Sequence, residues 1–257
     1  MPETGVTIVI PVFNKIEITT NCIDHVREFN KKCAYEIIVV DNGSTDKTEE
    51  VLSNYKNIIY IRNQENLGIS KAYNQAAEKA KHDIFCFMHN DVFLFEKEWI
   101  HKITNFIIEV PDAGIVGLYG AKTVRKDGSF KGKTIVHSKK NAPTIKGLFE
   151  RVAVVDGLLM AMQKSIFKAI EGFNEDFTVH FYDKDISIRA IKKRYMNYVL
   201  NIPFEHQCAA TRKHLHNENK NREEAREIFM KIWACFLPVD VTTWLEKLSF
   251  AFKGFNK

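Results

Sequence analysis

Short apolar runs alternate with helix-spaced segments over the first hundred residues. Four apolar runs, at residues 6–12, 35–40, 58–62 and 84–88, predict buried strands. Apolar side chains recur at helical spacing between them, over residues 17–30, 45–53 and 68–81. Strands that are apolar on both faces and separated by helices are typical of a parallel sheet. We therefore expect an α/β fold, with helices flanking a doubly wound, mostly parallel central sheet.

The second half of the chain is less regular. Lys and Arg accumulate over residues 120–150 around glycine and proline, which predicts an exposed basic loop or hairpin. Regular structure resumes with an apolar segment at 152–162, helices at 164–170 and 183–193, and a strand at 198–202. After His206 we expect mostly helix, broken at Pro238, with an amphipathic helical tail over residues 241–257.

Composition excludes several classes of protein. With 257 residues that are 45% hydrophobic, the chain is not intrinsically disordered, collagen-like or a disulfide scaffold. The five cysteines form no C-x-x-C pair, which indicates a reducing compartment and disfavours a zinc ribbon. A signal-peptide pattern is missing, and no apolar stretch approaches the length of about 18 residues that spans a bilayer. We expect a cytoplasmic protein, with peripheral contact to a membrane as an open alternative.

The net charge of +5 conceals an asymmetry between the two halves. Residues 1–100 hold 11 basic and 15 acidic side chains, whereas residues 101–257 hold 26 and 17. The basic residues at 120–150 either hold an anionic acceptor or membrane surface, or form a solvated face. Nucleic acid is not an expected partner, because aromatic residues are not interleaved with the lysines.

Three polar clusters directly follow predicted strands, where parallel sheets bind their ligands. They are PVFN at 11–14, DNGSTD at 41–46 and HND at 89–91. Asp41 can accept hydrogen bonds from a ribose or a base; alternatively, Asp41 and Ser44 form a turn that caps the next helix. No G-x-G-x-x-G follows the first strand, which argues against a dinucleotide-dependent dehydrogenase.

Asp91 lies between two hydrophobic runs, residues 84–88 and 92–95. A carboxylate in such surroundings must be paired, hydrogen-bonded or bound to a metal, because burying its isolated charge is costly. A divalent cation that bridges phosphates would satisfy it. The alternative is a helix cap or turn.

Seven motifs in order resemble those of family 2 inverting glycosyltransferases with the GT-A fold. They are VTIVIPVFN (6–14), EIIVVDNGSTD (36–46), NLGISKAYN (66–74), FMHNDV (87–92), VDGLLM (155–160), GFNEDF (172–177) and FYDKDISIRA (181–190). The resemblance covers about residues 5–240. It implies one GT-A domain over residues 1–240, with a nucleotide-binding part at about 1–100 and an acceptor-binding part at 101–240.

The resemblance implies a nucleotide-sugar donor, a divalent metal (Mn²⁺ or Mg²⁺) and inversion at the anomeric carbon. UDP is the first expectation for the nucleotide and dTDP the next, while the sugar and the oligomeric state stay open. The acceptor would be a hydroxyl group of a glycan, glycolipid or glycoprotein. The positions that match nucleotide-binding positions of the family are Pro11, Phe13, Asn14, Asp41, Asn42, Gly43, Ser44, Asn66, Gly68, Asn74 and Asn90.

The resemblance also places a metal site and a general base. His89 stands where the family often has the first Asp of its metal motif, so Asp91 and the downstream His206 are the implied metal ligands. Asp183 falls on the position of the general base and Asp185 on the acidic position after it. From position alone, a favourable charge at a helix N-terminus is the preferred interpretation of this pair, and only the other motifs favour catalysis.

Asp156 and Gly157, with Tyr182, are expected to line the pocket for the donor sugar or the acceptor; a packing turn at 156–157 is the alternative. Two other functions compete with a glycosyltransferase. A nucleotidyltransferase would need a Gly- and Arg-rich loop after the first strand, and PVFNK is not one. Because His89 replaces the first Asp of the metal motif, a non-catalytic nucleotide- or carbohydrate-binding module of the same fold is the second alternative. The retained residues Asp91, Asp183 and His206 argue against it.

Overall fold

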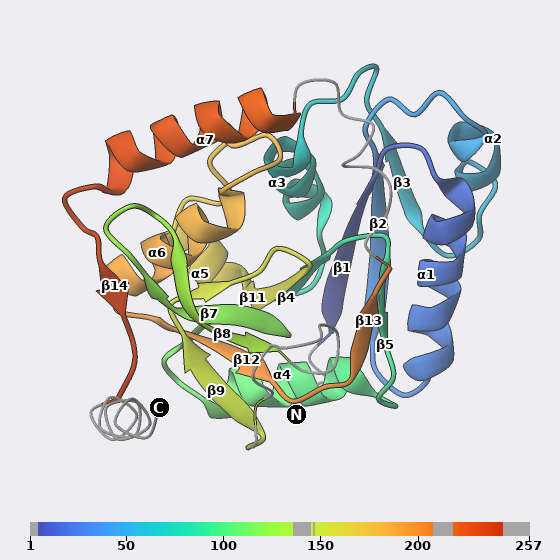
Figure 1. Cartoon of the computed structure of the whole chain (residues 1–257). Coiled ribbons are helices and arrows are strands. Elements are labelled where there is room, and N and C mark those ends of the chain that lie inside the picture. The colour runs from blue at the N-terminus through green and yellow to red at the C-terminus, as the bar shows by residue number, and fades with distance from the viewer. Residues whose placement is uncertain (1–4, 136–144, 146, 208–217, 244–257) are drawn as a thin grey trace.

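The computed structural model describes residues 5–135, 145, 147–207 and 218–243. Its core is an eight-stranded sheet with the strand order β3-β2-β1-β4-β11-β6-β12-β9 (Figure 1). The strands of this sheet are β1 (Val6–Val12), β2 (Tyr35–Asp41), β3 (Ile59–Arg62), β4 (Ile84–Met88), β6 (Ala113–Gly117), β9 (Phe149–Val152), β11 (Leu159–Gln163) and β12 (Met196–Leu200).

The first four strands of the chain are parallel to one another, as the apolar runs predict. Three helices join them, α1 (Ile16–Phe29), α2 (Thr48–Leu52) and α3 (Ile69–Lys79). All residues of β4, and all but Pro11 in β1, are buried, because helices cover both faces of the sheet. The three polar clusters consequently meet at the carboxyl edge of this parallel part.

The sheet becomes mixed beyond β4. Strand β11 runs antiparallel to both β4 and β6, whereas β12 is parallel to β6 and antiparallel to β9. The apolar segment at 152–162 is therefore not one element, because the turn at 156–158 separates β10 (Val154–Val155) from β11. Helix α4 (Trp99–Glu109) and strand β6 fill a stretch for which the periodicity assigned no element.

Two smaller sheets complete the fold. One joins β10, β7 (Tyr119–Val124), β8 (Phe130–Ile135) and β14 (Val239–Asp240), and the other pairs β5 (Val92–Leu94) with β13 (Phe204–His206). The basic segment is thus a β7–β8 hairpin in its first half, turned at Gly128, whose φ is +76°. Residues 136–144 and 146 of that segment lie outside the described residues.

Among the described residues after 163, three helices occur. They are α5 (Lys164–Ala169), α6 (Tyr182–Lys192) and α7 (Glu218–Trp233), close to where helices were expected. Figure 1 shows α7 lying over α6, and Phe181 packs on Phe229 of α7 with ring centroids 5.2 Å apart. The predicted amphipathic tail falls mainly on 244–257, outside the described residues. Among the helices described, none is long and apolar enough to cross a bilayer.

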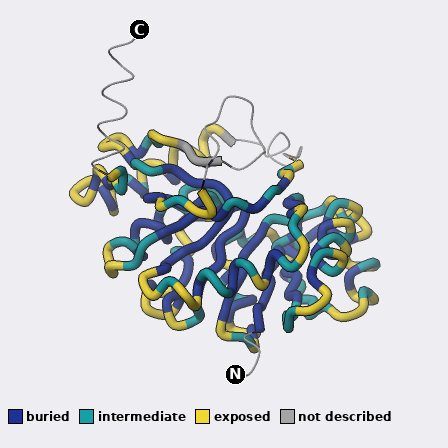
Figure 2. Tube along the Cα trace, turned by 90° about the horizontal axis from the view of Figure 1, so that it is seen from below, coloured by how far each residue is buried: buried dark blue, intermediate teal, exposed yellow. Residues whose placement is uncertain are grey.

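Burial separates the sheet from its coverings. The strands of the central sheet are mostly buried, and exposed residues gather on the outer helices and loops (Figure 2). Several polar side chains are nevertheless fully buried, among them Asn197 of β12. Asn197 accepts a hydrogen bond from the amide of Ile115 at 3.2 Å and donates to the carbonyls of Ala153 and Ser187 at 3.0 and 2.9 Å. Asn197 thereby connects β6, the β9–β10 junction and α6.

We expect Asn197→Leu to lower the free energy of unfolding by about 3 kcal/mol or more. The leucine would leave one amide and two carbonyls buried without these partners, and each such group costs about 1–3 kcal/mol. Urea unfolding followed by circular dichroism measures the change. Asn221→Leu, at an exposed position of α7, is the matched control, and equal stability of the two variants would contradict the structural role of Asn197.

Candidate functional site

Asp91 and His206 are brought together by the two-stranded sheet β5–β13. In this antiparallel ladder His206 faces Val92, and the amide of Gln207 donates to the Asp91 carbonyl at 3.0 Å. The His206 Nε2 atom lies 3.1 Å from Oδ1 of Asp91. Each of the two side chains is 13% exposed, so the pair lines an accessible edge of the structure without projecting into solvent.

His89 joins this pair from the end of β4. Its ring centroid is 5.8 Å from that of His206, and one ligand atom from each of His89, Asp91 and His206 lies within 4.8 Å of the others. Two imidazoles and one carboxylate at this spacing suit a divalent transition metal. The residue that departs from the family motif is therefore part of the cluster.

Tyr182 connects His89 to α6. The Nε2 atom of His89 and the Tyr182 hydroxyl are hydrogen-bonded at 2.8 Å, and Tyr182 is only 5% exposed. The same hydroxyl lies against Gly157, where an added Cβ atom would overlap it. Gly157 is thus required by the close approach of Tyr182 to the 156–158 turn.

Asp183 follows Tyr182 and faces the same turn. Its carboxylate accepts hydrogen bonds from the backbone amides of Lys184, at 2.8 Å, and of Gly157. Burial and the nearby Asp156 carboxylate raise the pKa of Asp183 to about 6, against the opposing effect of Lys184. A carboxylate with such a pKa is ionised at neutral pH and is a better proton acceptor than an ordinary aspartate.

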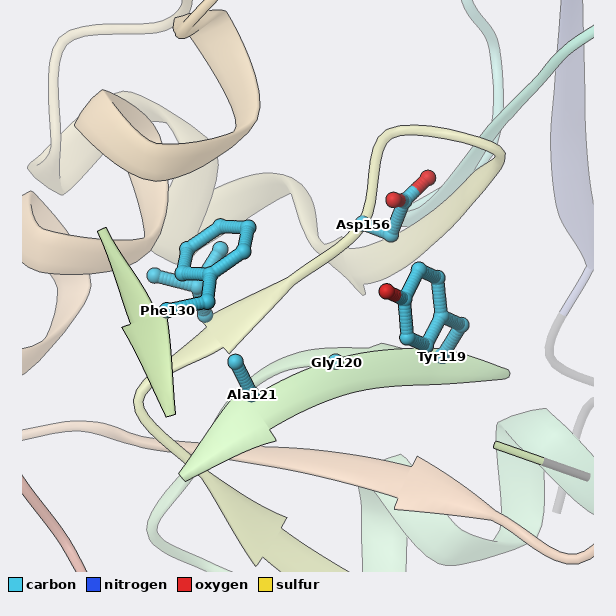
Figure 3. Close-up of a pocket in the computed structure, with 6 residues that line it drawn as sticks. Tyr119, Gly120, Ala121, Phe130 and Asp156 are labelled. Atoms are coloured by element: carbon cyan, nitrogen blue, oxygen red, sulfur yellow. The ribbon is translucent and has the colours of Figure 1, made fainter. Parts of the chain in front are cut away.

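Asp156 stands next to Tyr119 in a narrow crevice between the 154–156 segment and β7 (Figure 3). The Asp156 amide donates to the Tyr119 carbonyl at 2.8 Å, and one carboxylate oxygen accepts the Leu158 amide at 3.1 Å. Burial, Asp156 and Asp183 together raise the pKa of Tyr119 to about 12, so its hydroxyl stays protonated. Asp156, Tyr119 and Asp183 form one electrostatically coupled group.

The first two loops at the sheet edge are tied together by Asn14. Its backbone amide donates a hydrogen bond to the Ser44 hydroxyl at 2.7 Å, and its side-chain oxygen accepts a hydrogen bond from the Thr45 backbone amide at 2.8 Å. Asn14 itself has a φ of +60°, in the left-handed region that asparagine tolerates. Pro11 and Phe13, just before it, are partly exposed along this edge.

Asp41 is fully buried, and both of its carboxylate oxygens are engaged. Oδ1 accepts a hydrogen bond from the Ser44 backbone amide at 2.8 Å. Oδ2 accepts hydrogen bonds from the Tyr60 hydroxyl at 2.7 Å and from Nη1 of Arg62 at 2.6 Å. Arg62 and Tyr60 were missed by the sequence reasoning. The sequence alone could not reveal them, because positions 60 and 62 point to one face of β3 and only the register of β2 and β3 pairs Arg62 with Asp41.

The remaining loop residues connect α3 to the 172–178 loop. Asn42 donates to the Gly68 carbonyl at 3.1 Å, and Asn66 accepts the Gly68 amide at 3.0 Å. Asn74 donates to the Phe173 carbonyl and accepts the Phe173 amide, at 2.9 and 3.0 Å. Two glycines have positive φ here and pack closely on other backbone, Gly43 on Glu65 and Gly68 on Thr178.

Asn90 is held away from this loop network. Its side-chain amide donates to the Thr19 hydroxyl of α1 at 2.9 Å. It sits between the two metal-site candidates His89 and Asp91 in sequence, and its bond to α1 fixes the turn that carries both of them.

Comparison with known proteins identifies the family. The sequence profile described as glycosyl transferase family 2 matches residues 7–171, which is more than half of the chain. The chain belongs to glycosyl transferase family 2. Within this family 2 chain, the match includes His89 and Asp91 and ends before Asp183 and His206.

The family 2 chain also resembles individual proteins. It is 24% identical over 204 residues to the O-antigen chain rhamnosyltransferase RfbN of Salmonella typhimurium, a match that covers 74% of this chain and 62% of RfbN. The chain thus spans less than two thirds of that relative's length.

Two solved glycosyltransferase structures share its fold. The mannosyltransferase PcManGT from Pyrobaculum calidifontis, in complex with GDP-Man and Mn²⁺, matches with a TM-score of 0.57 and 16% identity, over 79% of this chain and 58% of that chain. GalNAc-T7 with UDP, GalNAc and Mn²⁺ matches with a TM-score of 0.69 and 11% identity, over 90% of this chain and 48% of that one. The expected GT-A fold is confirmed.

In this family 2 chain the side chains of Asp185 and Asp183 have different surroundings. The Asp185 side chain is 2% exposed, and Oδ2 accepts Nε of Arg189 at 2.8 Å while Oδ1 accepts Nε1 of Trp233 at 2.9 Å. Arg189 in turn donates to the Ile170 carbonyl. Asp183 therefore lies at the 156–158 turn, whereas Asp185 connects α6 to α7 through its hydrogen bond with Trp233.

We expect Asp185→Ala to lower the free energy of unfolding by about 3 kcal/mol, because removing one partner of a buried ion pair leaves the other charge uncompensated. Urea denaturation provides the measurement. Asp176→Ala, at an exposed position, is the control, with an expected change below about 0.5 kcal/mol. An Asp185→Ala protein as stable as this control would show that Asp185 has no fastening role.

Proposed function

We propose that the chain transfers a sugar from a nucleotide-sugar donor to a hydroxyl group of an acceptor, with metal dependence and with inversion at the anomeric carbon. One observation carries this proposal. A His–Asp–His cluster and a carboxylate with a pKa of about 6 are linked through the adjacent residues Tyr182 and Asp183, since Tyr182 bonds to His89. Such a transfer needs cationic stabilisation of the leaving diphosphate and removal of a proton from the acceptor.

The donor is proposed to bind along the loops at the sheet edge. Pro11, Phe13 and Asn14 border this edge, and the buried Asp41 holds Arg62 beside Ser44. A guanidinium positioned by a carboxylate is a good donor to a base or phosphate oxygen. UDP is our first choice for the nucleotide and dTDP the second, and the UDP in the GalNAc-T7 structure of the same fold supports this order.

The cation is proposed to be held by His89, Asp91 and His206. Bound there, it would neutralise negative charge that develops on the diphosphate as the sugar leaves. Two nitrogen ligands favour Mn²⁺ over Mg²⁺, since Mg²⁺ prefers oxygen ligands and retains its water. The Mn²⁺ in both structural neighbours supports this choice.

Asp183 is proposed as the general base. Its carboxylate would accept the proton of the acceptor hydroxyl while that oxygen attacks the anomeric carbon from the face opposite to the leaving diphosphate, which inverts the configuration. The backbone amides of Lys184 and Gly157 fix the orientation of this carboxylate. Asp156, Gly157 and Tyr182 would border the reacting sugar, and Asp185 would act by positioning α7.

The acceptor is proposed to be a glycan, glycolipid or glycoprotein hydroxyl that approaches from the part of the chain after residue 100. This part carries the β7–β8 hairpin, α6 and α7, and it holds all of the surplus positive charge, with 26 basic against 17 acidic residues. The name of RfbN, an O-antigen chain rhamnosyltransferase, supports a polysaccharide context.

The activity of the enzyme is expected to fall about tenfold per pH unit below pH 6. The pKa of Asp183 is raised to about 6, so the carboxylate is protonated, and unable to accept a proton, below that value. The measurement is kcat/KM for transfer against pH, with the donor chosen by a thermal-shift screen of UDP- and dTDP-sugars. Asp183→Asn should reduce turnover by about 10²–10⁴-fold while donor affinity is retained; a flat profile from pH 5 to 7.5 would exclude Asp183 as the base.

Removing either imidazole of the cluster should weaken Mn²⁺ binding. We expect His206→Ala and His89→Ala each to lower Mn²⁺ affinity by about 100-fold or more, since even residues that only orient metal ligands contribute about 10–100-fold. Calorimetric titration of the protein with Mn²⁺ and with Mg²⁺ gives the affinities, and Mn²⁺ should bind more tightly. His101→Ala, on the exposed face of α4, is the matched control; unchanged affinity in the cluster variants would refute the site.

A further inference from the structure

A cavity of about 340 Å³ lies beside the proposed base and is distinct from the His89–Asp91–His206 cluster. Its walls are the β7–β8 turn, the first turn of α6 and the N-terminal half of α7. Phe181 and Lys184, which flank Tyr182 and Asp183 in sequence, both line it. The cavity is therefore constructed from the same turn of helix that presents Asp183.

Three cationic side chains converge on this cavity, Lys184 from α6 with Arg222 and Arg226 from α7. The Lys184 ammonium donates to the Gly128 carbonyl at 2.9 Å and lies 4.0 Å from the ring centroid of Phe181 and 4.3 Å from that of Phe130. The pKa of Lys184 is lowered to about 8, mainly by burial. The positive charges of Arg222 and Arg226 lower this pKa further, whereas the negative charge of Asp183 raises it. An anion in the cavity would relieve the mutual repulsion of these three charges.

The carboxylates at the cavity do not cancel this charge. Asp127 and Glu223 are the two acidic residues of the lining, against three cations. One oxygen of Asp127 already accepts the Ser129 amide at 2.9 Å, and Glu223 approaches Arg226 only to 3.8 Å. The cavity therefore keeps an excess of positive charge together with acceptors for hydroxyl groups.

We propose that this cavity binds a phosphate-bearing sugar unit of the acceptor. The inference rests on the proposed glycosyl transfer, because it assigns the acceptor a position next to Asp183. The guanidinium groups of arginines and the ammonium group of a lysine bind a phosphate group through charge-assisted hydrogen bonds. The Phe181 ring offers an apolar surface for a sugar ring, and Asn219, Asp127 and Glu223 offer partners for its hydroxyls.

The size of the cavity supports a single unit. Binding sites for small molecules usually start at about 300 Å³, so about 340 Å³ accommodates one sugar with its phosphate. The shared chemistry is a glycosyl phosphate, whether free in solution or carried by a lipid. Its charge matches the basic character of the second half of the chain.

The experiment titrates the full chain with glucose 1-phosphate, with a short-chain alkyl glucosyl phosphate and with neutral methyl glucoside. Saturating UDP and Mn²⁺ occupy the donor site throughout, and their binding is measured first in a separate titration. We expect both phosphorylated probes to bind and methyl glucoside to bind at least about tenfold more weakly. Tighter binding of the alkyl probe would indicate a lipid-carried acceptor, and equal binding a soluble one.

The variants locate the site. Arg222→Gln with Arg226→Gln should weaken the binding of glucose 1-phosphate about tenfold or more and reduce its salt dependence, while UDP and Mn²⁺ bind as before. Both arginines are exposed, so the double variant is expected to fold, and Lys231→Gln on the same helix is the matched control. Unchanged probe affinity in the double variant, or equal affinity for methyl glucoside, would overturn the inference. Failure of UDP and Mn²⁺ to bind would instead contradict the proposed function.

Discussion

The hydrogen bond between His89 and Tyr182 joins the two parts of the site. His89 ends a strand of the parallel half, whereas Tyr182 begins a helix of the mixed half, and the contact forms only because Gly157 has no side chain. It connects the His–Asp–His cluster to the residue that directly precedes Asp183, which is a buried tyrosine. The proposed transfer would need such a connection, because the bond to the leaving group and the bond to the acceptor would change at the same carbon.

The parallel half of the fold was predictable from the sequence because its strands are buried on both faces. Residues 6–12 and 84–88 are almost continuously apolar, and helices of clear periodicity separate them. The antiparallel course of β11 was not predictable, since an apolar run does not encode strand direction. Helix α4 went unassigned although it buries Trp99, Ile100, Ile103 and Ile107 at helical spacing, because no capping residue marks its start at Glu98.

The site was predictable only in part, for reasons of geometry. Asp183 and Asp185 lie two residues apart on a helix, which turns them about 200° from each other, so one faces the 156–158 turn and the other faces Arg189 and Trp233. The motif order could not tell the two apart. His206 could be identified from the resemblance alone, whereas its contact with Asp91 depends on the three-residue ladder of β5 and β13. The contact of Arg62 with Asp41 was not predictable, because only the register of β2 and β3 places these two residues side by side.

The β5–β13 ladder has a consequence for the assembly of the chain. It joins Val92–Leu94 to Phe204–His206 through only three pairs of residues, so few backbone hydrogen bonds hold the segment after β12 against β5. A cation shared by Asp91 and His206 would join the same two segments with far stronger bonds. With a cation bound as proposed, metal binding and the docking of Phe204–His206 on β5 would be thermodynamically linked, and the concentration of free metal would set how firmly this short strand is held.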